Sequence, residues 1–214
     1  MNRTAPLEQA ELAIIGAGCA GLSLARQLVR TEKTSSIKAC LYGPVSPATT
    51  NRHSWGFWAT QGLEEQTELA RQRWHKWQII TAERKVTQTA VLHPYCRLDS
   101  RDWLTHCLNI IDGNIQQEPD GLPTPGAQPI FDSRPPDVPD GAMLQHFRGV
   151  EIKAAQPCFS PDTAILMDFR CDQSRGIHFI YLLPYSSTEA LVESTMLSPK
   201  RQNEEFYAEA IKTY

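Results

Sequence analysis

The sequence has no excess of one charge and no long apolar run, and each absence excludes a class of protein. The formal net charge is −3 over 214 residues, with acidic and basic residues interspersed, so we expect no nucleic-acid partner. No apolar run approaches the roughly 20 residues that a membrane-spanning helix needs, and residues 1–11 show no secretory signal. We therefore expect a cytoplasmic protein, and we expect any contact with a membrane to be peripheral.

Paired cysteine motifs are also absent. The six cysteines are spread along the chain without a CxxC pair, and the six histidines show no metal-ligand spacing. This distribution fits free thiols in a reducing cytosol better than a disulfide framework or a zinc site. The sequence therefore predicts no disulfides and no metal.

A glycine-rich segment lies near the amino terminus. Residues Leu12–Ile15 are typical of a short buried strand, and three glycines at GxGxxG spacing follow it. Apolar residues from Leu22 to Val29 then recur with the period of a helix. A strand, turn and helix in this order present free backbone N–H groups and the positive end of a helix dipole to a ligand. The pattern favours dinucleotide binding at Gly16, Ala17, Gly18 and Gly21, and the alternative is a glycine-rich loop without a ligand.

Each glycine has a separate physical role in such a motif. Gly16 would form the turn, Gly18 would let a phosphate approach the backbone, and Gly21 would let the helix pack closely on the strand. Dinucleotide folds usually have Asp or Glu about 20 residues further on, where it holds the ribose hydroxyls. Tyr42 and Gly43 occupy that place here. Adenosine binding would therefore lose a charge-assisted hydrogen bond.

The remaining pattern divides the chain near residues 135–141, which are rich in proline and glycine. Before this segment we expect a dinucleotide-binding region, residues 1–134, and after it an antiparallel-sheet region, residues 141–214. The predicted strands are 37–42, 77–82, 86–92, 129–134, 150–153, 164–169, 177–183 and 190–196. Helices are expected over 64–76, from a capping Ser100 to about 111, and over 203–214, with a loop over 112–128. The fold class is α/β, and the antiparallel sheet could form one wall of an apolar pocket.

Glu193 is the most informative carboxylate. It lies in a strand that is apolar on its amino-terminal side. If the side chain faces a dry cavity, desolvation raises its pKa and makes it a proton donor near neutral pH. If it faces water, it is an ordinary surface acid. Asp168 ends another apolar run, and either holds a partner such as Arg170 or marks the end of a strand.

The segment Asn51–Trp58 combines three aromatic residues with Arg and His. Its composition alone fits a surface loop anchored by tryptophans as well as it fits a functional site.

Several separated stretches together resemble the lycopene cyclases, which are flavin-dependent carotenoid enzymes. The resemblance covers nearly the whole chain. It is carried by Ile15–Ala25, Asn51–Trp58, Phe131–Arg134, Gln145–Ile152, Phe159–Arg170, Tyr181–Ser186 and Ala190–Ser198. Such enzymes are considerably longer than this chain.

The resemblance implies a Rossmann-like FAD/NAD(P)-binding domain with an antiparallel-sheet substrate domain that is incomplete at the C-terminus. It also implies an intramolecular lyase or isomerase reaction, in which a protein acid protonates lycopene and an ionone ring closes without net redox change. The implied cofactors are reduced FAD and NAD(P)H, and the resemblance implies that the enzyme acts on lycopene at a membrane surface. Glu193 matches the acid proposed for the family, and Asp132 joins the glycines as a cofactor-binding residue.

Two alternatives stay open at this point. One is a remnant or binding module that keeps the fold but not the flavin, and the other is a flavin-dependent oxidoreductase acting on another isoprenoid.

Overall fold

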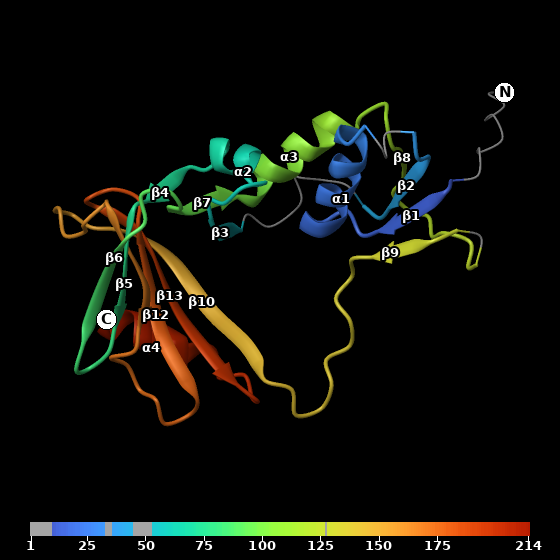
Figure 1. The fold of residues 1–214 in the computed structure, drawn as a ribbon. Coiled ribbons are helices and arrows are strands. Elements are labelled where there is room, and N and C mark those ends of the chain that lie inside the picture. Colours follow the sequence, from blue (N-terminus) through green and yellow to red (C-terminus); the bar gives the residue numbers. More distant parts are fainter. Residues whose placement is uncertain (1–9, 33–35, 45–52, 127) are drawn as a thin grey trace. The chain divides into compact units, whose positions relative to one another are not determined.

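The computed structural model of this chain describes residues 10–32, 36–44, 53–126 and 128–214 (Figure 1). The chain forms two compact units. The first contains Met1–Trp55 and Leu98–Asp137, and the second contains Gly56–Arg97 and Val138–Tyr214. Residues 56–97 thus belong to the second unit, whereas the sequence analysis assigned them to the dinucleotide-binding region.

The first unit is built on a parallel sheet with the strand order β8-β2-β1-β9. The strands are β1 (Leu12–Ile15), β2 (Ala39–Tyr42), β8 (Gln116–Glu118) and β9 (Ile130–Asp132). All their pairings are parallel, so their carboxyl ends lie at one edge of the sheet. The strands expected near 12–15, 37–42 and 129–134 are confirmed. The loop expected over 112–128 is wrong in part, because β8 consists of three polar residues that give no hydrophobic signal.

Two helices pack against each other in the first unit, α1 (Cys19–Arg30) and α3 (Ser100–Ile111). Apolar side chains spaced for one helical face, such as Leu22 and Trp103, are buried. The Trp103 indole Nε1 donates a hydrogen bond to Ser23 Oγ at 2.9 Å. Both helices were expected, but the cap of α3 was wrong. Asp99, not Ser100, is the N-cap, since its side chain accepts a hydrogen bond from the backbone N–H of Arg101.

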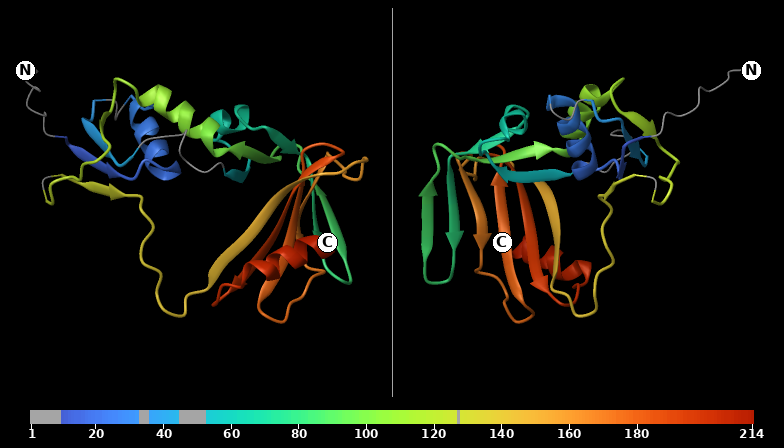
Figure 2. Two further views of the ribbon diagram at one scale, coloured as in Figure 1. Left: turned by 180° about the vertical axis from the view of Figure 1, so that it is seen from behind. Right: turned by 45° about the vertical axis from the view of Figure 1, so that its right-hand side comes forward.

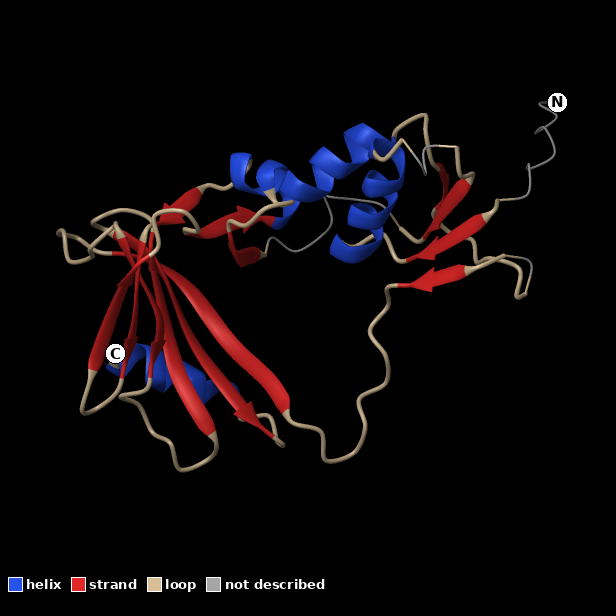
Figure 3. Ribbon diagram, in the orientation of Figure 1, coloured by secondary structure: helices blue, strands red, loops and turns tan. Residues whose placement is uncertain are grey.

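The second unit is dominated by a six-stranded sheet with the order β10-β13-β12-β11-β5-β6, drawn in red in Figure 3. Its strands are β5 (Lys76–Ile80), β6 (Lys85–Thr89), β10 (Leu144–Lys153), β11 (Thr163–Asp168), β12 (Ile177–Pro184) and β13 (Glu189–Ser198). All neighbours pair antiparallel except β11 and β5, which are parallel. The expected antiparallel sheet and the hairpin of β5 and β6 are therefore confirmed.

Helix α4 (Glu204–Thr213) packs on β10 and β13 and covers one face of this sheet (Figure 2). It begins at the N-cap Asn203, whose side chain accepts a hydrogen bond from the backbone N–H of Phe206. The helix expected over 203–214 is confirmed.

A second, three-stranded sheet has the order β3-β7-β4. Its strands are β3 (Ser54–Trp58), β4 (Gln72–Trp74) and β7 (Tyr95–Asp99), with the short helix α2 (Glu64–Glu68) between β3 and β4. The helix expected over 64–76 is therefore wrong beyond Glu68. Trp74 is fully buried and its Nε1 donates a hydrogen bond to the Pro184 carbonyl oxygen at 3.0 Å. Its burial and the pairing with β7 outweigh the local helical tendency.

Side chains alternate between the two faces of the six-stranded sheet. One face carries Tyr181, Leu183, Leu191 and Glu193 at paired positions of β12 and β13. A buried cluster of Trp74, Ala164, Leu166 and Leu183 lies on this face, with Trp77, Tyr95, Tyr181 and Leu191 packed against it. We call this face of the sheet the aromatic face. The opposite face, called the α4 face, carries Ile180 and Val192.

The two glycines of the first turn of α1 provide a matched test of close packing. A Cβ at Gly21 would overlap the Gly16 carbonyl oxygen, whereas a Cβ at Gly18 would meet nothing within 4 Å. We expect Gly21→Ala to lower the free energy of unfolding by about 1–3 kcal/mol, as overpacking does. Gly18→Ala should cost clearly less. Urea unfolding measures both, and equal losses would contradict this packing.

Candidate functional site

The glycine turn joins the ends of three strands of the first unit. Gly16 has a φ of +97°, a left-handed conformation that favours glycine. Its N–H donates a hydrogen bond to the Tyr42 carbonyl oxygen at 2.8 Å, which closes the turn onto β2. Ser133 Oγ donates to the Ile15 carbonyl oxygen at 2.8 Å, which ties the turn to β9. Sequence reasoning gave Ser133 no role of its own.

The start of α1 is open to a ligand in the way that a pyrophosphate requires. Its N-cap is Gly18, which has no side chain to cap the helix, and the first turn contains no acidic residue. The space at the Cβ position of Gly18 is empty to 4 Å, while Ala17 lies between the two turn glycines. Free N–H groups and the helix dipole attract a phosphate here. The residues of the turn therefore fit a dinucleotide.

Asp132 lies at the carboxyl end of β9, in register with Ile15 of β1. Arg134 Nη2 contacts its Oδ2 at 2.6 Å. Hydrogen bonds from Arg134 lower the pKa of Asp132 to about 2, so the carboxylate is ionised at neutral pH. The structure brings Asp132 to the same sheet edge as the glycines. Its contact with a cofactor stays a prediction.

Glu193 lies in the middle of β13 on the aromatic face. It pairs with Gly149 on β10 and with Tyr181 on β12. Its side chain is half-buried, and this burial raises the pKa of its carboxyl group. Thr195 Oγ1 donates a hydrogen bond to Glu193 Oε1 at 2.8 Å. Desolvation therefore favours the neutral acid, and one hydrogen bond fixes its orientation.

Gly149 leaves room beside the second oxygen of this carboxyl group. A Cβ built at position 149 would lie 3.4 Å from Glu193 Oε2 and 3.2 Å from Leu191 Cδ1. Oε1 accepts the hydrogen bond from Thr195, and Oε2 is the oxygen that lies beside the Cβ position of Gly149. Because Gly149 has no side chain, β10 does not cover Oε2 at this position.

Aromatic rings lie on the same sheet face as Glu193. Tyr95 and Tyr181 pack against the same buried cluster on this face. Burial first, and then the charges of Tyr181 and Glu193, raise the pKa of Tyr95 to about 12. The Trp58 ring lies 5.1 Å from that of Tyr95 and 5.6 Å from that of Trp77. A Cβ at Gly56 would overlap the Tyr95 hydroxyl. Within the Asn51–Trp58 segment, Trp58 thus packs against Tyr95 and Trp77 of the second unit, whereas Asn51 and Arg52 lie outside the described residues.

Asp168 has a different environment. Its side chain is buried on the α4 face, where Arg170 Nη2 contacts Oδ2 at 2.6 Å and the Tyr214 hydroxyl donates to Oδ2 at 3.1 Å. Burial acts to raise the pKa of Asp168, but the hydrogen bonds and charge of Arg170 outweigh it and hold the pKa below its usual range. The expected pairing with Arg170 is confirmed, and Asp168 is an ionised structural partner rather than a proton donor.

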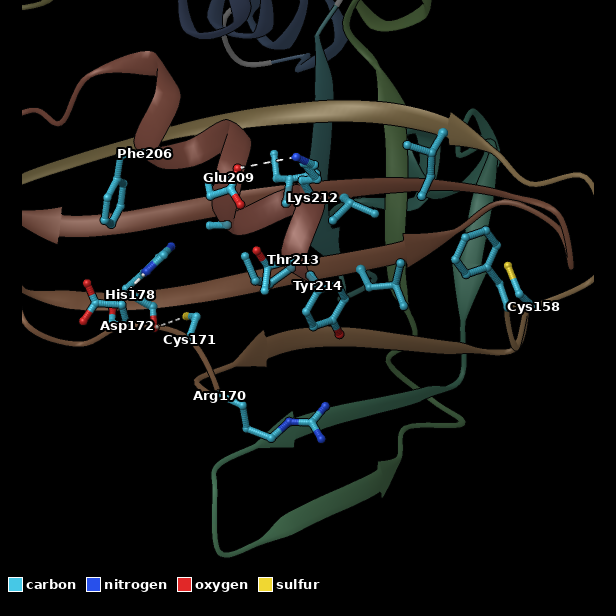
Figure 4. Close-up of a pocket in the computed structure, with 17 residues that line it drawn as sticks. Cys158, Arg170, Cys171, Asp172, His178, Phe206, Glu209, Lys212, Thr213 and Tyr214 are labelled. Carbon is cyan, nitrogen blue, oxygen red and sulfur yellow. Dashed lines mark hydrogen bonds and ion pairs between the residues drawn. The ribbon is translucent and has the colours of Figure 1, made fainter.

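The α4 face contains a cavity of about 1080 Å³ between the sheet and α4. Phe206 and Tyr214 line it from the carboxyl-terminal segment, and His178 and Asp172 line it from the sheet side (Figure 4). The His178 and Phe206 rings are 5.0 Å apart. Val192 faces this cavity, so its neighbour Glu193 points to the other side of the sheet. The cavity is therefore separate from the candidate acid.

No group of His, Cys, Asp and Glu in the described part of the chain is arranged to hold a metal ion. None of the six cysteines, all of which lie in the described ranges, forms a disulfide bond. No helix within the described ranges is long and apolar enough to cross a membrane.

Comparison with protein families gives one match over most of the chain. The model of the family described as lycopene cyclase protein matches residues 11–111 and 119–214. A comparison with individual curated proteins gives no match.

Solved structures share the fold at low sequence identity. PqsL from P. aeruginosa, in complex with 2-aminobenzoylacetate, has a TM-score of 0.63 at 12% identity over 88% of this chain and 61% of its own. A geranylgeranyl bacteriochlorophyll reductase-like protein from Thermoplasma acidophilum has a TM-score of 0.63 at 10% identity, over 95% and 60%. The halogenase PltM, in complex with phloroglucinol and FAD, has a TM-score of 0.61 at 10% identity, over 97% and 56%. The α/β fold class is thus confirmed, and this chain spans about 60% of the length of these proteins.

Replacing Thr195 tests the orientation of Glu193. The Thr195 hydroxyl favours the charged form of the carboxyl group, so Thr195→Val should raise the pKa of Glu193 further. Titration of the Glu193 carboxyl by carbon-13 NMR measures this pKa. Thr87→Val, on the exposed strand β6, is the control and should leave it unchanged. An unchanged or lower pKa in Thr195→Val would contradict the hydrogen bond.

The raised pKa of Glu193 also predicts how stability depends on pH. Between the unfolded-state pKa, about 4.3 for glutamate, and the higher folded-state pKa, the native protein binds more protons than the unfolded chain. The contribution of Glu193 to the free energy of unfolding therefore falls as the pH rises through this window. Glu193→Gln should remove that contribution to the slope. Urea unfolding of both proteins at a series of pH values checks it, and parallel curves would argue against a buried acid.

Proposed function

Because this chain belongs to the lycopene cyclase family, we propose that it cyclises the linear ends of lycopene to ionone rings, with Glu193 as the acid. The observation that carries the proposal is a half-buried glutamic acid of raised pKa among aromatic rings on one sheet face. A neutral carboxylic acid can donate a proton at neutral pH, whereas an ordinary surface glutamate is already ionised.

The reaction is an isomerisation that consumes no redox equivalents. Oε2 of Glu193 gives its proton to the terminal double bond, and a carbocation forms on the neighbouring carbon. An internal double bond attacks that carbon, which closes a six-membered ring and moves the positive charge onto it. Loss of a ring proton then forms the ionone double bond, and Glu193 regains a proton. The number of atoms and electrons in the polyene is unchanged.

The aromatic face suits both the substrate and the intermediate. Trp58, Trp77, Tyr95 and Tyr181 offer apolar surface to a polyene. Their ring faces carry partial negative charge, and a cation over such a face is stabilised by roughly 0.5–2 kcal/mol. The same rings exclude water, which would otherwise quench the carbocation.

The glycine turn fits the flavin that the family resemblance implies. Gly16, Ala17, Gly18 and Gly21 would hold its pyrophosphate, and Asp132 would lie at the neighbouring strand end. When bound and kept reduced by NAD(P)H, the flavin supplies an electron-rich ring that favours positive charge nearby. Since lycopene dissolves only in lipid, we propose that the protein works peripherally at a membrane surface.

The test is pigment analysis of lycopene-accumulating cells that express the full chain. Wild-type protein should yield ionone-ring carotenoids. Glu193→Gln should lower the yield at least about 100-fold, because general acids typically contribute that much or more. Glu189→Gln is the matched control on the same strand. Its carboxylate lies at the surface, where it pairs with Lys153 at 3.0 Å, and the variant should keep wild-type activity.

Unchanged lycopene with the wild-type chain would contradict the proposal, and purified protein without a flavin absorbance band would favour a non-catalytic remnant. Stoichiometric consumption of a nicotinamide nucleotide would favour an oxidoreductase acting on another isoprenoid.

A further inference from the structure

The end of β2 lacks the acid that dinucleotide folds use for the ribose hydroxyls. Tyr42 is the last residue of β2, and Gly43 follows it with a φ of +123°. The Cβ position of Gly43 lies 3.5 Å from the backbone nitrogen of Ala17. The chain at this point is therefore next to the glycine turn, with no carboxylate at the position where one is usual.

The neighbouring strand brings a carboxylate to the same edge. Strand β8 runs parallel to β2, and Glu118, its last residue, pairs with Tyr42. The N–H of Gly43 donates a hydrogen bond to the Glu118 carbonyl oxygen at 3.1 Å. Adjacent strands are about 4.8 Å apart, so a glutamate side chain spans the distance from β8 to the end of β2.

The charge of Glu118 also acts on Tyr42, the last residue of β2. The pKa of Tyr42 rises to about 12, first through burial and the Cys40 thiol, and additionally through the charge of Glu118. Gln116 Nε2 donates a hydrogen bond to Glu118 Oε1 at 3.0 Å. A carboxylate has about four acceptor positions, so that of Glu118 can accept further hydrogen bonds. The Glu118 side chain is half-buried, which leaves part of it accessible to a ligand.

The other described acids at this edge are less suitable. Asp132 is held by Arg134 on the far side of β1. Asp120 lies beyond the end of β8 and is exposed. Glu118 alone among these acids is in register with the end of β2.

We propose that Glu118 binds the hydroxyls of the adenosine ribose of FAD and thereby replaces the missing acid at the end of β2. This inference rests on the proposed flavin site. It makes Glu118 a residue that selects FAD over FMN, because FMN has no adenosine.

The experiment compares the binding of FAD and FMN to the purified full chain by flavin fluorescence. A hydrogen bond to a charged group corresponds to about tenfold to a hundredfold in affinity. Glu118→Gln should weaken FAD binding by this factor and leave FMN binding unchanged. Asp120→Asn, the control two residues away, should bind both flavins as the wild type does.

A second variant keeps the test independent of folding defects. Tyr42→Asp in the Glu118→Gln background moves the acid to the end of β2 and should restore FAD affinity. Unchanged FAD affinity in Glu118→Gln, or an equal loss for FAD and FMN, would overturn the role of Glu118. A wild-type chain that binds neither flavin would overturn the flavin site itself together with this inference.

Discussion

The proposed chemistry depends on the partial burial of one carboxyl group against a sheet face that carries aromatic rings. Water stabilises an ionised glutamate far more than an apolar environment does. Glu193 lies beside Tyr181 and Tyr95 on the face that also buries Trp74. The sheet thus favours the protonated form of this acid, and the hydrogen bond from Thr195 fixes the orientation of the carboxyl group.

The fold produces this environment through strand register. Glu193 lies between two residues that face α4, so a shift of one residue along β13 would turn it toward the cavity on the α4 face. Ten paired positions with β10 and eight with β12 hold this register. The absence of a side chain at Gly149 and at Gly56 then leaves space for the carboxyl group and for the Tyr95 ring. In the first unit, glycines likewise allow close contacts, and the resulting turn suits a pyrophosphate.

Helices and strands whose apolar residues recur at regular spacing were predicted from the sequence better than those without such a pattern. Strand β1, helix α1 and the antiparallel strands have apolar residues at regular spacing, and their positions were expected. Strand β8 was missed because its residues are all polar, and β4 was taken for helix because Trp74 pairs and packs with distant residues. The role of Tyr95 near Glu193 could not be predicted, because it comes from a strand 98 positions earlier in the chain, and only tertiary pairing brings the two together.

The central claim is that Glu193 is protonated at a pH where exposed glutamates are ionised. The most direct measurement is the pH dependence of the protonated carboxyl band of Glu193 in the infrared spectrum of the wild-type chain, identified by its loss in Glu193→Gln. We expect this band to persist well above the ordinary glutamate pKa of about 4.3. A band that disappears at the ordinary pKa would contradict the central claim.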